Sequence, residues 1–75
     1  MNADNELDAR GLSCPLPILR TKKSLSAMSP GQVLKVTATD PGSIKDMEAF
    51  SRQTGNELLS ASEENGEYIF YMKRK

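Results

Sequence analysis

The sequence feature that most constrains this chain is a short segment with one cysteine and two prolines, Gly11-Leu12-Ser13-Cys14-Pro15-Leu16-Pro17. Glycine interrupts the alternating run that precedes it. A proline is tolerated in the first turn of a helix because the N–H groups there have no partner within the helix. We therefore expect a helix that begins at Pro15, with Cys14 as its N-cap.

The expected position of Cys14 favours thiolate chemistry. The N-terminus of a helix stabilises a negative charge by roughly 0.3–1 kcal/mol, and this lowers the pKa of a thiol. Pro15 and Pro17 have no N–H group, so Leu16 supplies the main donor within reach, and we expect the pKa to fall only moderately below the free value of about 8.5. The alternative is structural, since a lone cysteine in a small domain is often a small buried apolar residue.

The length and charge of the chain exclude several kinds of protein. A chain of 75 residues is long enough for one small domain, residues 1–75, with a thin core and no second domain. Ten basic and ten acidic residues give a formal net charge of zero, which gives no support for direct nucleic-acid binding. No apolar run is long enough to cross a membrane, and the polar N-terminal segment does not resemble a signal peptide.

The supply of metal-ligating residues restricts the chemistry further. The chain has one cysteine and no histidine, so it lacks the usual ligands of a zinc site and cannot form an internal disulfide. We therefore expect neither a metal nor a cofactor. A single free thiol stays reduced in the cytoplasm, which is the expected compartment.

Hydrophobic periodicity predicts an alternation of strands and helices. Asn65-Gly66 between two strand-like runs indicates a hairpin with a type I′ turn. The order βαβαββ predicts an α+β fold, a two-layer α/β sandwich in which a four-stranded mixed sheet carries both helices on one face. The predicted elements are strands over Glu6–Ala9, Val33–Thr39, Glu57–Glu64 and Glu67–Lys73, a helix over Pro15–Met28, and a second helix that starts within Asp40–Ser43 and ends at Gly55.

Helical periodicity assigns a core stripe to each predicted helix. Two N-caps are possible for the second helix, either Asp40 followed by Pro41, or Ser43 with Asp46 three residues later. Phe50 falls at the edge of the stripe in that helix. The predicted stripe residues are Ile18, Thr21, Leu25 and Met28 in the first helix and Ile44, Met47, Ser51 and Thr54 in the second.

Two leucines fall outside the core stripe of the first helix. Leu16 and Leu19 project to the other side of the helix, beside Arg20 and Lys23 and close to the cysteine. Exposed leucines flanked by cations next to a reactive thiol indicate a docking surface for another protein. The alternative is ordinary surface exposure, since single exposed leucines are common.

Charged residues near the thiol are candidates for a supporting role. If the first two strands are parallel, Cys14 and Asp40 both follow strand ends and should lie on the same rim of the sheet. Asp40 could orient a partner or a loop, or it could serve only as a helix cap. Arg10, Lys22 and Lys23 could supply positive potential to an anion on Cys14, although each alone could equally be a solvated surface charge.

The segment Leu7–Pro17 is similar to the signature of the TusA/SirA/YedF family of small sulfur-carrier proteins. Its most specific part is Cys-Pro-x-Pro after Asp-x-x-Gly-Leu. The resemblance implies that Cys14 carries sulfane sulfur as a persulfide, and it implies a two-layer α/β sandwich, in agreement with the predicted order of elements. The supporting motif is Gly11, Pro15 and Pro17, and the similarity continues through Pro30-Gly31, Asp40-Pro41, Asp46 and Gly55.

The same resemblance implies a sulfur relay. A cysteine desulfurase or a rhodanese-like sulfurtransferase would pass sulfur to Cys14, and the persulfide would hand it to an acceptor protein, for example in tRNA thiolation. Such a chain is a persulfide carrier with an active cysteine and not a stand-alone enzyme, and we expect it to be monomeric. Two alternatives stay open, a regulatory or RNA- or protein-binding module without sulfur chemistry, and a redox sensor that pairs Cys14 with a partner's thiol.

Overall fold

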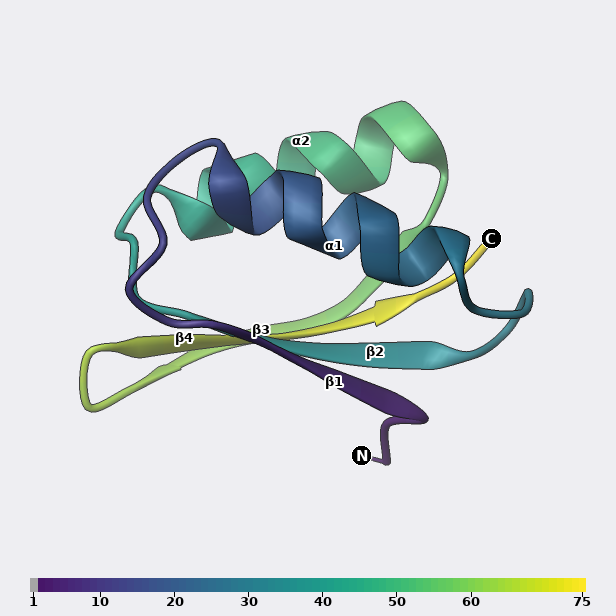
Figure 1. Cartoon of the computed structure of the whole chain (residues 1–75), viewed down its shortest axis with the longest axis horizontal. Helices are drawn as coiled ribbons and strands as arrows, with labels where there is room; N and C mark the ends of the chain where they lie inside the picture. The colour runs from purple at the N-terminus through teal and green to yellow at the C-terminus, as the bar shows by residue number, and fades with distance from the viewer. Residues whose placement is uncertain (1) are drawn as a thin grey trace.

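The structure, a computed structural model, describes residues 2–75. Both helices lie on the same face of a single four-stranded sheet, whose strand order is β1-β2-β4-β3 (Figure 1). This arrangement confirms the predicted two-layer α+β fold. Within the described range the elements are β1 (Asn5–Ala9), α1 (Leu16–Ser26), β2 (Val33–Ala38), α2 (Ser43–Thr54), β3 (Glu57–Glu64) and β4 (Glu67–Lys73).

The sheet is mixed because its first pair of strands is parallel and the other pairs are antiparallel. β1 runs parallel to β2, with Leu7 opposite Val36 and Ala9 opposite Ala38. β4 lies antiparallel between β2 and β3. A parallel pair needs a crossover connection, and α1 provides it. As a result, β1 and β2 end at the same edge of the sheet, and the segments that lead into the two helices both start there.

The core lies between the helices and the inner face of the sheet. Side chains alternate along a strand, so every second residue of β2 faces the helices, and Leu34 and Val36 are at most 1% exposed. Phe70 of β4 lies opposite Val36 and is fully buried. Leu34, Val36 and Ala38 therefore form the inner face of β2. The buried apolar residues are Ala9, Leu25, Met28, Leu34, Val36, Ala38, Met47, Phe50, Phe70 and Met72.

The hairpin between β3 and β4 turns at Asn65 and Gly66. Both residues have a positive φ, 51° and 80°, as a type I′ turn requires. Asparagine tolerates the left-handed region and glycine adopts it without a steric penalty. The bounds of β3 and β4 are those predicted, whereas β1 begins one residue earlier and β2 ends one residue earlier than expected.

Both ends of α1 differ from the prediction. The helix begins at Leu16 with Pro15 as its N-cap, because the backbone of Pro15 (φ −99°, ψ 15°) is not helical. Cys14 therefore lies before the N-cap and outside the helix. The helix ends at Ser26, two residues before the predicted Met28, because the next two N–H groups donate to carbonyls three residues back. Met28 is nevertheless buried, as expected of the core stripe.

The helix α2 begins at Ser43, within the predicted range Asp40–Ser43, but both predicted N-caps of this helix were wrong. Its N-cap is Gly42, and no side chain forms a capping hydrogen bond, so neither Asp40 nor Ser43 is the cap. The Ser43 N–H instead donates to the backbone carbonyl of Asp40 at 3.0 Å. A backbone turn thus satisfies the donor that a side-chain cap would have satisfied.

The buried side of α2 includes a residue that was expected at the edge. Phe50 is 6% exposed and belongs to the core with Met47, because burying an aromatic ring removes far more apolar surface from water than burying a serine. Ser43 is 1% exposed and shares this side of the helix. The remaining predicted stripe residues, Ile44, Ser51 and Thr54, are half-buried.

The helices are short, 11 residues in α1 and 12 in α2. Gly55 ends α2 with a φ of 80°, which confirms its predicted role at the C-terminus of that helix. In residues 2–75, no helix combines the length and the apolar character needed to cross a lipid bilayer.

Replacing Phe70 with alanine should lower the free energy of unfolding by about 3–5 kcal/mol, because it leaves a cavity at a fully buried position. Leu19→Ala shortens a side chain that is 54% exposed, and it should change the free energy of unfolding by no more than about 0.5 kcal/mol. Urea unfolding followed by circular dichroism measures both values. Losses of equal size would contradict the position of the core.

Candidate functional site

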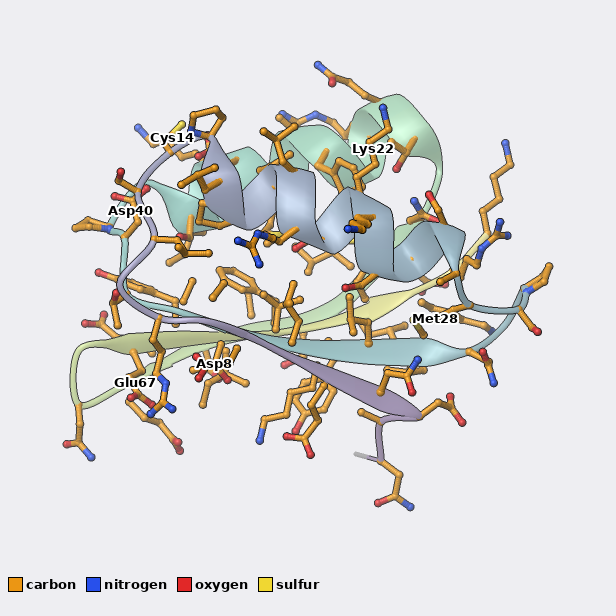
Figure 2. The ribbon with its side chains drawn as sticks, viewed as in Figure 1. Asp8, Cys14, Lys22, Met28, Asp40 and Glu67 are labelled. Atoms are coloured by element: carbon orange, nitrogen blue, oxygen red, sulfur yellow. The ribbon has the colours of Figure 1, made fainter. Side chains whose placement is uncertain are left out.

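Cys14 lies at the head of α1, above the edge of the sheet at which β1 and β2 end (Figure 2). Its thiol is free and exposed, so Cys14 is not the buried structural residue of the alternative interpretation. It borders an open groove of about 210 Å³ between the two helices. The groove is lined by Cys14, Pro15, Ile18, Asp46, Ala49, Phe50 and Gln53.

Gly11 and Thr39 fix the loop that carries Cys14. Gly11 has a φ of 78°, which glycine adopts at little cost, and its N–H donates to Thr39 Oγ1 at 2.9 Å. Thr39 directly follows β2, so this bond ties the loop after β1 to the end of the neighbouring strand. Thr39 was not among the predicted site residues. The only signal for it was its place at the end of a strand parallel to β1.

The two prolines shape the start of α1 in different ways. Pro15 is the N-cap, and the peptide bond between Cys14 and Pro15 is cis. Pro17 is buried among the core-facing residues of α1. The Leu16 N–H donates to the carbonyl of Ser13 at 2.9 Å. The donor that was expected to stabilise a thiolate on Cys14 is therefore engaged by the backbone.

The pKa of the Cys14 thiol is raised, and the moderate lowering expected from the helix dipole was wrong. The largest cause is a hydrogen bond with the Asp46 side chain, followed by desolvation and by the negative charges of Asp46 and Asp40. Asp46 belongs to the first turn of α2 and lines the same groove as Cys14. The expected lowering came mainly from the dipole of α1, whereas the carboxylates that raise the pKa come from α2 and the loop before it.

Two carboxylates converge at the start of α2. A methyl group on Gly42 would lie 3.5 Å from Asp40 Oδ2 and 3.9 Å from Asp46 Oδ2. Asp40 Oδ2 and the Ser43 hydroxyl are buried and have no hydrogen-bond partner among the described residues. Asp40 does share the rim with Cys14, as predicted, and Figure 2 shows the two side by side. Asp40 forms no capping hydrogen bond in α2, and its negative charge contributes to the raised pKa of the Cys14 thiol.

The structure places Arg10 and Lys22, two of the candidate cations, away from the thiol. Arg10 Nε and Nη2 donate to the two carboxylate oxygens of Asp8 at 2.9 and 3.0 Å, and Nη1 lies 3.5 Å from Glu67 Oε2. Figure 2 shows Asp8 and Glu67 on the far side of the sheet from Cys14. Lys22 lies further along α1, where it lines a separate groove near the C-terminal ends of the helices.

Leu16 and Leu19 are 41% and 54% exposed, which confirms that both side chains lie outside the core. Arg20 and Lys23 are exposed on the same helix. The first two turns of α1 therefore present apolar and cationic side chains next to the rim that carries Cys14. Their use as a docking surface stays a prediction.

The site has few candidates for metal ligands. Across residues 2–75, no three His, Cys, Asp or Glu side chains are grouped as the ligands of a metal ion would be. The groups that raise the pKa of the thiol are two carboxylates, Asp46, which lines the same groove, and Asp40, which acts through its negative charge. The arrangement can hold a proton on sulfur, and it leaves the sulfur open to a second molecule.

The fold and site define a class of small α+β domain in which an exposed cysteine within a Cys-Pro-x-Pro sequence precedes the first helix. The family described as Sulfurtransferase TusA matches residues 5–74. The chain therefore belongs to the TusA family, which confirms the resemblance drawn from the segment Leu7–Pro17.

Individual relatives agree with this assignment. The sulfur carrier protein TusA of Allochromatium vinosum is 65% identical over 71 residues, covering 95% of this chain and 93% of that protein. The sulfur carrier protein TusA of Pseudomonas entomophila is 42% identical over 72 residues, covering 96% and 90%. The crystal structure of a SirA-like protein from Desulfitobacterium hafniense matches the fold with a TM-score of 0.80 at 24% identity, covering 92% of this chain and 95% of that one.

Removing the guanidinium of Arg10 should raise the pKa of Asp8. The side-chain hydrogen bond from Arg10 is the largest cause that lowers this pKa from 3.8 to about 2. Because the folded-state pKa is depressed, the pair stabilises the fold above the ordinary value and loses its effect as the pH falls through about 2. An NMR titration of the Asp8 carboxyl carbon should show the rise in Arg10→Ala and no change in Lys23→Ala. An Asp8 that titrates normally in the unmodified protein would show that Arg10 is free to move elsewhere.

Proposed function

We propose that this protein is a sulfur carrier, in which Cys14 accepts a sulfane sulfur as a persulfide and transfers it to a thiol of an acceptor protein. The observation that carries the proposal is the free, exposed thiol of Cys14 on an open rim, in a chain of the TusA family. The relatives described above are sulfur carrier proteins. A cargo of one atom needs an accessible thiol and no enclosed pocket, which suits a domain of this size.

The transfer is an exchange between sulfur atoms. In loading, the Cys14 thiolate attacks the outer sulfur of a persulfide on the donor. A new S–S bond forms on Cys14, the S–S bond of the donor breaks, and the donor cysteine leaves as a thiolate. Unloading is the same step with the acceptor thiolate as nucleophile and Cys14 as leaving group. No oxidant is consumed, so the chain is a carrier that needs two partners and not a stand-alone enzyme.

The partners are a donor, either a cysteine desulfurase or a rhodanese-like sulfurtransferase, and a downstream acceptor. Each must bring a sulfur atom to Cys14 and must therefore contact the start of α1. Leu16 and Leu19 offer apolar contact area there, and Arg20 and Lys23 favour an acidic partner surface. The carrier acts as one monomeric domain in the cytoplasm, where its thiol stays reduced, in a pathway such as tRNA thiolation.

Incubation with a cysteine desulfurase and cysteine should add one sulfur atom to the intact mass of the protein, and a reductant should remove it. Cys14→Ser should gain no sulfur, because it lacks the accepting atom. Its thermal transition should stay within a few degrees of the original, since an exposed side chain contributes little to the core. A protein that never gains sulfur from this donor or from a small persulfide would contradict the carrier function and favour a binding module.

Leu19→Glu should slow sulfur loading from the desulfurase at least about fivefold without unfolding the domain, because it places a charge in the proposed contact with the donor. Ser62→Glu is the matched control. Ser62 is exposed and lies opposite Ile69, so it faces away from the helices. The substitution therefore adds the same charge on the other side of the sheet. Loading rates and urea midpoints measure the outcome. If both variants slow loading equally, or if Leu19→Glu unfolds the domain, the docking surface is wrong.

A further inference from the structure

The groove beside Cys14 has apolar residues on its α1 side and a carboxylate on its α2 side. The α1 side contributes Pro15 and Ile18, and the α2 side contributes Asp46 together with uncharged side chains. The charged groups that act on the thiol are Asp46 from α2 and Asp40 from the loop before it. No cation lines this groove within residues 2–75, and Arg10 is held by Asp8 and Glu67 on the far side of the sheet.

The carboxylate in this groove affects the reactivity of the Cys14 thiol before a partner protein binds. A thiol that is protonated is a poor nucleophile, since the thiolate is the reactive form. The Asp46 carboxylate lines the same groove as the Cys14 thiol, so it repels the negative charge that would form on sulfur. An exposed thiolate would be open to oxidation and alkylation, whereas the protonated thiol resists both.

We propose that Asp46 keeps the thiol of the empty carrier protonated, so that Cys14 reacts slowly with small molecules and reacts readily with a protein donor whose basic side chain neutralises this carboxylate. Asp46 is thus a positioning residue that keeps the proton on the Cys14 sulfur and pairs with the basic side chain of the partner. The inference rests on the proposed carrier function and adds a rule for when the carrier becomes reactive. Asp40 strengthens the same field from the neighbouring loop.

The step balances without any further reactant. When a partner's ammonium or guanidinium group pairs with Asp46, the thiolate is no longer disfavoured and the S–H proton leaves to water. The thiolate then attacks the outer sulfur of the donor persulfide, the donor S–S bond breaks, and the donor cysteine leaves as a thiolate. The basic group stays on the partner and departs with it.

The first test measures the rate of Cys14 alkylation by iodoacetamide against pH. Asp46→Asn should alkylate severalfold faster at pH 7, because more of its thiol is ionised. At a pH above the thiol pKa of both proteins, Asp46→Asn should alkylate at the same rate or more slowly than the original protein, because a less basic thiolate is intrinsically less nucleophilic. Asp46→Glu should keep most of the original profile. Glu48→Gln removes the same charge from an exposed position on α2 outside the groove and should change nothing.

The second test compares two sulfur donors for the original protein and for Asp46→Asn. Loading from glutathione persulfide should become severalfold faster at pH 7 in the variant, and loading from a cysteine desulfurase should not. An equal gain with both donors would overturn the part assigned to the partner's basic group. Circular dichroism verifies that the variants are folded. If Asp46→Asn does not fold, the original protein still decides, because its thiol must titrate above that of a peptide spanning residues 11–17.

The outcomes separate this inference from the carrier function. If the original protein takes up no sulfur, the carrier function fails, while the alkylation profiles still report on Asp46. If the protein takes up sulfur but the alkylation profiles of the original protein and Asp46→Asn coincide, the carrier function stands and the role of Asp46 is overturned.

Discussion

The parallel pairing of β1 with β2 is the constraint on which the rest of the structure depends. A parallel pair cannot be closed by a tight turn, so the chain must cross over the sheet through α1 before β2 can form. That crossover places the ends of both strands at one edge of the sheet and starts both helices there. The loop with Cys14 and the loop with Asp40 then share a rim, and the bond from Gly11 to Thr39 joins the two loops.

A small core leaves much of each helix free for contacts outside the domain. The buried side of α1 is occupied by Pro17, Thr21 and Leu25, and Ile18 packs against the core beside them. Leu16 and Leu19 are consequently not required for packing. The core-packing residues of α1 and the residues of the proposed docking surface thus lie on opposite sides of one helix, so a change on the outer side leaves the core contacts in place.

The sequence predicted what depends on neighbouring residues and missed what depends on distant ones. Asn65-Gly66 identified a hairpin because the turn is specified by two adjacent residues, and the helical periodicity identified Thr21 and Leu25 as buried residues of α1. The effect on the Cys14 thiol was missed because Asp46 is 32 positions away and acts through the packing of α2 against α1. The N-caps were missed because backbone turns replaced the side-chain caps that local sequence suggested.

Both helices of residues 2–75 cover the same face of the sheet, so the outer face is open to solvent. That face carries polar groups such as the Lys35–Glu6 ion pair, 3.8 Å between Nζ and Oε1, and the exposed Ser62. This two-layer domain therefore exposes one face of its sheet to water, on the side away from the helices and Cys14. A tether or fluorophore attached at Ser62 would hold the protein on a sensor surface with Cys14 facing the solution, where donor and acceptor can visit it in turn.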